Sequence, residues 1–165
     1  MKETTLNKEF YALVEPLLLS AGYEVTYGRL VTIRKGRFIA DLLPYRHEVG
    51  NGYYLCFRII VRAKDLKRLN VTGRIVLANA LSMIHPGFNI AYHHSGCALA
   101  LRYQCDLYEP KDIRYQLEQV KESYTELRND MQKRLPDFIK QFPRPDTQEK
   151  QLVKELKYLH RWRLE

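Results

Sequence analysis

Apolar residues recur along this chain at two spacings, and each spacing predicts a different kind of element. Near the N-terminus they follow the i, i+3, i+4, i+7 and i+8 stripe of an amphipathic helix, with Asn7 as candidate N-cap and Gly22 as the stop. The stripe consists of Phe10, Leu13, Val14, Leu17 and Leu18. Pro16 falls inside the stripe and is expected to kink the helix.

Farther along, apolar and polar residues alternate, which predicts β-strands. The expected strands are residues 30–34, 38–43, 53–61, 88–93 and 97–107. Gly36 lies where a tight hairpin turn needs a positive φ, a looser turn surrounds Asn51, and a second hairpin turns around Ser95-Gly96. Because successive side chains of a strand point to opposite faces, the sheet should have one apolar and one polar face.

Two more helices are predicted. Residues 71–84 are apolar on most sides, which suggests that another subunit covers this helix in addition to the sheet. The second helix starts at Glu109-Pro110 and is expected to end or bend near Leu135, before Pro136. Its apolar seam is Ile113, Leu117, Val120, Tyr124, Leu127 and Met131. We favour a helix along the sheet over a coiled-coil dimer seam, because a firm coiled-coil pattern needs roughly three to four heptads.

Together these elements predict an α+β protein. An antiparallel sheet of about five strands would carry its helices largely on one face, in the order α-β-β-β-α-β-β-α. Residues 1–142 would form one domain, and the break at Pro143-Arg144-Pro145 would open a C-terminal helical extension, residues 143–165. The narrow leucine stripe of that extension leaves three options: docking on the domain, mobility, or binding to a partner.

The net charge of +8 falls within one segment of the chain. Residues 29–74 hold eleven Lys or Arg against three acids, whereas the charges elsewhere nearly cancel. A localised positive field favours anionic partners and speeds their association. The segment includes the middle strands of the predicted sheet, so the positive charge is expected on one surface.

No motif in the sequence indicates an enzyme. His85, His93, His94, Cys97 and Cys105 gather within about twenty residues, but they lack the paired spacings of metal sites. No serine lies in a nucleophile elbow, and the glycine-rich turn at 50–52 lacks the lysine and the helix of a phosphate cradle. We therefore expect no catalytic residue, no metal and no cofactor.

The cysteines and the hydropathy of the chain indicate in which cellular compartment the protein is expected. The cysteines at positions 56, 97 and 105 suit buried, reduced thiols better than a disulfide framework. No apolar run approaches the ~18 residues that a membrane span needs, and no targeting signal is visible. These features predict a cytoplasmic protein that does not bind membranes.

Three stretches carry a resemblance to known proteins. They are the opening Phe10-x-x-Leu13-Val14-x-x-Leu17-Leu18-x-x-Ala21-Gly22, the short strand pairs, and the stretch from Leu77-Ala78-Asn79-Ala80 to Leu127. In element order, residues 6–135 resemble the fold shared by type III secretion chaperones and the bacterial YbjN-type sensory-transduction-regulator family. The resemblance implies an α+β sandwich, frequent homodimers and non-enzymatic binding of polypeptide. The chain departs from those chaperones in charge, since they are typically acidic.

The leading hypothesis is a protein-binding module, chaperone-like or regulatory, that uses the basic face of the sheet and can form a homodimer. Its expected partner is an acidic protein. The candidate contact residues are Arg34, Arg37, Tyr54, Arg58, Arg62 and Arg102. The same arginines and tyrosines would suit phosphates and bases, so nucleic-acid binding is the alternative.

Overall fold

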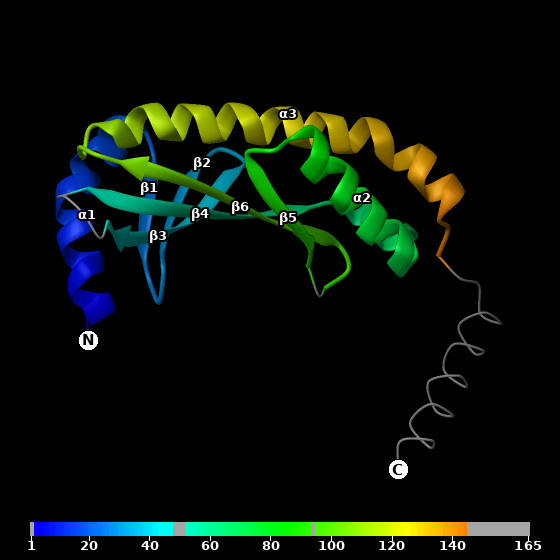
Figure 1. Ribbon diagram of the computed structural model, residues 1–165, viewed down its shortest axis with the longest axis horizontal. Helices are drawn as coiled ribbons and strands as arrows, with labels where there is room; N and C mark the ends of the chain where they lie inside the picture. The colour runs from blue at the N-terminus through cyan, green and yellow to red at the C-terminus, as the bar shows by residue number, and fades with distance from the viewer. Residues whose placement is uncertain (1, 48–51, 94, 145–165) are drawn as a thin grey trace, which may run out of the picture.

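The computed structural model describes residues 2–47, 52–93 and 95–144, and a six-stranded sheet forms its body (Figure 1). The helices are α1 (Lys2–Ser20), the short 3₁₀ helix η1 (Lys64–Arg68), α2 (Val71–Ile84) and α3 (Asp112–Gln141). The strands are β1 (Glu24–Tyr27), β2 (Val31–Lys35), β3 (Phe38–Arg46), β4 (Tyr53–Arg62), β5 (Phe88–Tyr92) and β6 (Ala98–Leu107). Their order across the sheet is β1-β2-β3-β4-β6-β5, and all neighbours are antiparallel.

The predicted α+β class is confirmed, but the strand count needs a correction. The sheet has six strands, and four of them precede α2. The sequence pattern missed β1 because this four-residue edge strand is largely exposed. Only Val25 of β1 packs partly against the core, so the alternation that indicates a strand is weak there.

The apolar face of the sheet packs beneath α3, which runs along it (Figure 1). All six residues of the predicted seam are buried, and Leu135 extends the seam by one more turn. Phe38 of β3 meets Tyr124 of α3 edge to face, with ring centroids 5.5 Å apart. The interpretation of this seam as a helix lying along a sheet is therefore confirmed.

Of the two predicted effects of Pro136, an end or a bend of the helix near Leu135, the structure shows the bend (Figure 1). The helix continues through Pro136 to Gln141, and Figure 1 shows its last turns curving away from the line of the earlier ones. An interior proline bends a helix, which can continue where packing holds the turns beyond it. Phe138 and Ile139 provide that packing against the core.

A hydrogen bond and close packing hold the start of α2 against the end of α3. The Asn70 side chain caps α2 by accepting a hydrogen bond from the Gly73 amide, at 2.7 Å. The Asn70 amide donates to the Phe142 carbonyl at 3.0 Å. A Cβ at position 73 would lie 2.5 Å from the Cβ of Phe142, so only glycine allows this approach.

The other end of α2 is tied to the middle of α3 by a charged network. His85 Nε2 lies 3.0 Å from Asp130 Oδ2, and Arg134 Nε donates to Asp130 Oδ1 at 2.8 Å. Burial opposes the ionisation of Asp130, but the hydrogen bonds from His85 and Arg134 outweigh it and hold its pKa below the usual range.

No helix in the described part of the chain is long and apolar enough to cross a membrane. The predicted leucine stripe of the C-terminal extension lies outside the described residues.

The Asp130 network makes a prediction about pH. A carboxyl group with a lowered folded-state pKa stabilises the fold above its ordinary pKa, and this contribution is lost as pH falls through the folded-state value. Asp130→Asn should therefore lower the free energy of unfolding by about 1 kcal/mol at pH 7. Below pH 3.8, the ordinary pKa of this group, the difference from the unsubstituted protein should shrink. Urea titrations at pH 7 and at a pH below 3.8 test this, and the exposed Asp137→Asn serves as the control. An equal loss at both pH values would contradict it.

Candidate binding surface

The face of the sheet opposite α3 is not crossed by any helix that the structure describes (Figure 1). We call it the open face. Its centre consists of Asp41, Tyr54, Cys56, Arg58, Ile60, Arg62, Ala100, Arg102 and Gln104. Their alternate neighbours, such as Leu55, Phe57 and Leu101, point into the core. The open face is therefore the polar side of the alternation in β3, β4 and β6.

Two arginines lie next to each other at the centre of the open face. Arg58 of β4 and Arg102 of β6 are direct cross-strand partners, and Asp41 of β3 is the partner of Arg58 on its other side. Asp41 accepts a hydrogen bond from Thr32 at 2.7 Å. Among the described residues, no ion pair involves Arg58, Arg62 or Arg102. The three guanidinium groups are thus available to anions from outside the chain.

An apolar row runs beside the arginines. Ile60, Ala100 and Ala91 are partners across β4, β6 and β5, in the register next to that of Arg58 and Arg102. Ile60 keeps 43% of its surface exposed although it lies mid-sheet. The open face therefore has a charged pair and an apolar pair next to each other, so it can contact acidic and apolar side chains of a partner at neighbouring positions.

Cys56 fills the centre of the open face but does not present a reactive thiolate. It is 4% exposed. Burial raises the pKa of its thiol, although the nearby Arg102 and Arg58 work in the opposite direction. This thiol acts as a small apolar side chain in the floor of the surface.

The tyrosines of the open face are only partly free. Tyr54, predicted as an aromatic anchor, is half-buried and donates a hydrogen bond to Gln104. Its ring lies 6.5 Å from that of Tyr45, which is 51% exposed. Tyr45 is therefore the more accessible aromatic group, and the sequence analysis did not select it as a contact residue.

A recess borders the open face at its α1 end. It has a volume of about 580 Å³ and lies between α1, the segment after β1 and the end of β3. Its lining combines apolar residues such as Leu43 and Pro44 with Tyr45, Arg29 and Arg58. Arg58 thus belongs to both the open face and this recess.

The structure divides the predicted basic segment among several surfaces. Arg34 of β2 lies on the open face, but Arg37 lies in the turn after β2 and lines a hollow against α3. Other cations are engaged: Arg46 pairs with Glu9 of α1, Lys35 donates to the Ala21 carbonyl, and Arg74 donates to the Leu66 carbonyl. A run of charge along the sequence is therefore not one charged surface in space.

The histidines and cysteines near the second hairpin do not gather as a metal site. His93 Nδ1 and Cys97 Sγ instead share the Ser95 hydroxyl, at 2.9 and 3.3 Å. Among the described residues, no group of three potential metal ligands is present. His85 is bound to Asp130, whereas His94 lies outside the described residues. Burial raises the pKa of the Cys105 thiol to about 12, and a hydrogen bond with Ser95 lowers that of Cys97. The cysteines at positions 56, 97 and 105 are free thiols.

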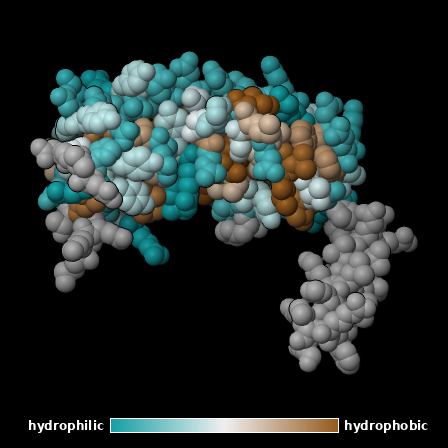
Figure 2. All heavy atoms as spheres, in the orientation of Figure 1, coloured by the Kyte–Doolittle hydropathy of each residue, from teal (hydrophilic) through white to brown (hydrophobic). Residues whose placement is uncertain are grey.

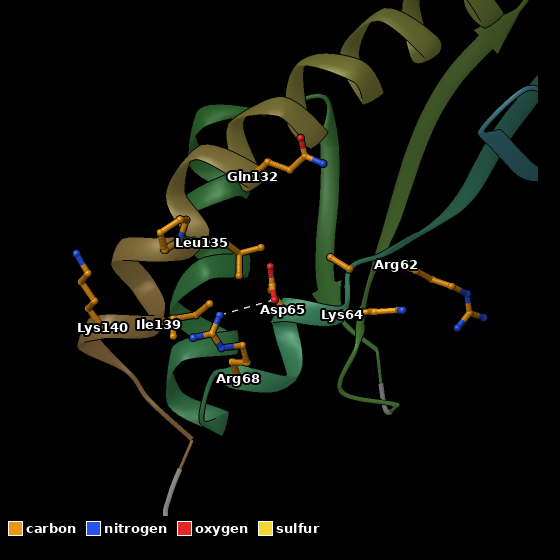
Figure 3. A pocket seen from close by; sticks show the side chains of 10 residues that line it. Arg62, Lys64, Asp65, Arg68, Gln132, Leu135, Ile139 and Lys140 are labelled. Carbon is orange, nitrogen blue, oxygen red and sulfur yellow. Dashed lines mark ion pairs between the residues drawn. The ribbon is translucent and has the colours of Figure 1, made fainter.

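Sequence reasoning missed a basic hollow between η1 and α3 (Figure 3). Its volume is about 570 Å³, and it combines an apolar floor with four cationic side chains. The only signal for it was the short run Lys64 to Arg68. The residues of α3 that complete the hollow lie more than sixty positions farther along the chain.

A further feature is an exposed apolar side of α2. Figure 2 shows hydrophobic side chains gathered over this helix. They are Val71, Ile75, Val76, Met83 and Ile84, each at least 38% exposed. This observation agrees with the broad apolar character of residues 71–84 in the sequence.

No protein-family model, curated protein or solved structure shows a significant match to this chain. The fold and its surfaces define an α+β protein with an open-faced antiparallel sheet. The resemblance to type III secretion chaperones and YbjN-type regulators stays a prediction.

Proposed function

We propose that this protein is a non-enzymatic binding module that recognises an acidic, partly apolar protein partner on the open face. The observation that carries the proposal is the pair Arg58 and Arg102, side by side at the centre of the sheet without an ion-pair partner among the described residues. A chaperone-like or regulatory accessory role is one form that such binding can take.

Arg58 and Arg102 repel each other across β4 and β6. Asp41 opposes Arg58 on its other side, but Arg102 has the uncharged Asn89 there. Like charges directly opposite each other on neighbouring strands destabilise a sheet, whereas opposite charges stabilise it. A partner carboxylate placed between Arg58 and Arg102 would relieve this repulsion. The arrangement is thus better suited to the bound state than to the free one.

The apolar row supports a polypeptide partner over a purely anionic one. Ile60 and Ala100 would be solvated beside a phosphate backbone, whereas a peptide can bury them with its own apolar side chains. From Tyr54 to Arg62 the open face of β4 extends over roughly 26 Å, at about 3.3 Å per residue, which accommodates an extended segment of eight or so residues.

The double substitution Arg58→Glu/Arg102→Glu tests the proposal. It should abolish retention of the partner when the protein is used as bait in a lysate of its host, with bound proteins quantified by mass spectrometry. Both side chains are exposed, so the variant should stay folded, with a melting temperature lower by no more than a few degrees because the new carboxylate at position 58 is opposite Asp41. The matched control, Arg114→Glu/Lys133→Glu on the exposed side of α3, has the same net charge and should retain the partner. Equal retention by both variants would contradict the proposal.

Nucleic-acid binding is the alternative, supported by the exposed Tyr45 beside Arg58 in the recess. Mobility shifts with single-stranded RNA and DNA distinguish the two. If the unsubstituted protein binds with an affinity that falls linearly with salt on a log–log scale, and the open-face variant does not bind, the alternative is correct.

We also propose that the exposed side of α2 binds a second copy of the chain. Its outward residues are uncharged: Val71, Thr72, Ile75, Val76, Asn79, Met83 and Ile84. Two chains of net charge +8 repel each other, so a contact between copies is most favourable where charge is absent. A partner that is attracted by the positive charge of the protein would find no charged group on this side of α2.

Mass measurement by light scattering tests the self-association. The unsubstituted protein should elute as a dimer, and Ile75→Glu/Met83→Glu should elute as a monomer with an unchanged circular dichroism spectrum. Both side chains are exposed, at 42% and 84%, so the substitutions should not disturb the monomer fold. If the unsubstituted protein stays monomeric at a concentration on the order of 100 μM, the proposal is overturned.

A further inference from the structure

The basic hollow between η1 and α3 has the composition of a binding site. Its floor is apolar, formed by Ala63 at the end of β4 and by Leu135, Pro136 and Ile139 of α3. Its rim carries Arg62, Lys64, Arg68 and Lys140, with Asp65 as the single acid. Ligand sites of proteins are concave and mostly apolar, with a few polar groups that orient the ligand, and a volume of about 570 Å³ is within their usual range.

The walls of the hollow are fixed to each other by the backbone. Leu66 and Leu69 anchor η1 and the residue after it in the core, at 1% and 0% exposure. The Arg144 amide donates to the Arg68 carbonyl at 2.9 Å, and Leu69 forms an isolated β-bridge with Pro143. The hollow therefore exists before any ligand binds, which lowers the entropic cost of binding.

The charge of the hollow is strongly unbalanced. Its lining has four cations and one acid, and the only ion pair there among the described residues joins Arg68 to Asp65 at 3.9 Å, with both side chains about two-thirds exposed. Such an exposed, long pair is weak, so an incoming carboxylate can replace Asp65. A concave surface lined by one sign of charge concentrates the field and attracts the opposite charge.

The positions of the cations indicate several anionic groups and not one. Figure 3 shows Arg62 and Lys64 extending to one side of the hollow and Lys140 to the other, with Arg68 and Ile139 between them. Cations on different sides of the hollow suit a ligand with several anionic groups better than a single phosphate or carboxylate. A peptide with acidic residues on either side of an apolar one is such a ligand.

We infer that the hollow between η1 and α3 binds an acidic peptide segment that places a large apolar side chain on Leu135 and Ile139 and its flanking carboxylates against Lys64, Arg68 and Lys140. This site is distinct from the open face. Only Arg62 borders both, so each site can be tested with the other intact.

The test uses the full chain and a fluorescein-labelled peptide of sequence Asp-Glu-Leu-Glu-Asp, with binding followed by fluorescence anisotropy. Lys64→Glu/Lys140→Glu should weaken binding at least tenfold, because both side chains line the hollow and both are exposed. The control Arg114→Glu/Lys133→Glu, of equal net charge, should change binding less than twofold. The peptides Asp-Glu-Ser-Glu-Asp and Asn-Gln-Leu-Gln-Asn should each bind at least fivefold more weakly.

The peptide position can be mapped directly. A benzophenone group in place of the leucine side chain should crosslink to the tryptic fragment that contains Leu135 and Ile139. Absence of peptide binding, or equal weakening by the hollow variant and the control variant, would overturn the inference. If Arg58→Glu/Arg102→Glu removes binding while Lys64→Glu/Lys140→Glu does not, the peptide occupies the open face: the inference fails and the proposed function stands.

Discussion

The packing of α3 along one face of the sheet is the constraint on which the rest of the structure depends. Its seam, from Ile113 to Leu135, is buried against the apolar side chains of β3, β4 and β6. Burial of this kind, at roughly 25 cal/mol per Å², is the main source of stability in a domain of this size. Because side chains alternate along a strand, covering one face with α3 directs Arg58, Arg62 and Arg102 to the other.

The same helix also builds the second surface. The turns of α3 beyond Pro136 are held against the start of α2 by the approach of Phe142 to Gly73 and by the hydrogen bond from Asn70. These contacts place the end of α3 opposite η1, and the basic hollow lies between the two helices. The open face and the hollow therefore share one structural cause, and Arg62 at the end of β4 lies at their border.

The spacing of apolar residues predicted the features that depend on local sequence alone. It gave residues 71–84 as α2, the buried seam of α3, and the side of β4 that carries Arg58 and Arg62. It missed β1, whose exposed edge position produces little alternation, and the hollow, whose residues meet only after α3 packs. Charge was the least reliable guide: Lys35, Arg46 and Arg74 belong to the same basic segment as the open-face arginines, but backbone carbonyls and Glu9 engage them elsewhere.

We propose that a partner covers the open face of the sheet. Hydroxyl-radical footprinting of the full chain, alone and bound to the partner that it retains, tests this most directly because it reports the exposure of individual side chains. Tyr45, Tyr54 and Ile60 should be protected in the complex, whereas the labelling of Tyr115 on α3, which is 62% exposed, should not change. Protection of Tyr115, with Tyr45 and Ile60 labelled as in the free protein, would contradict it.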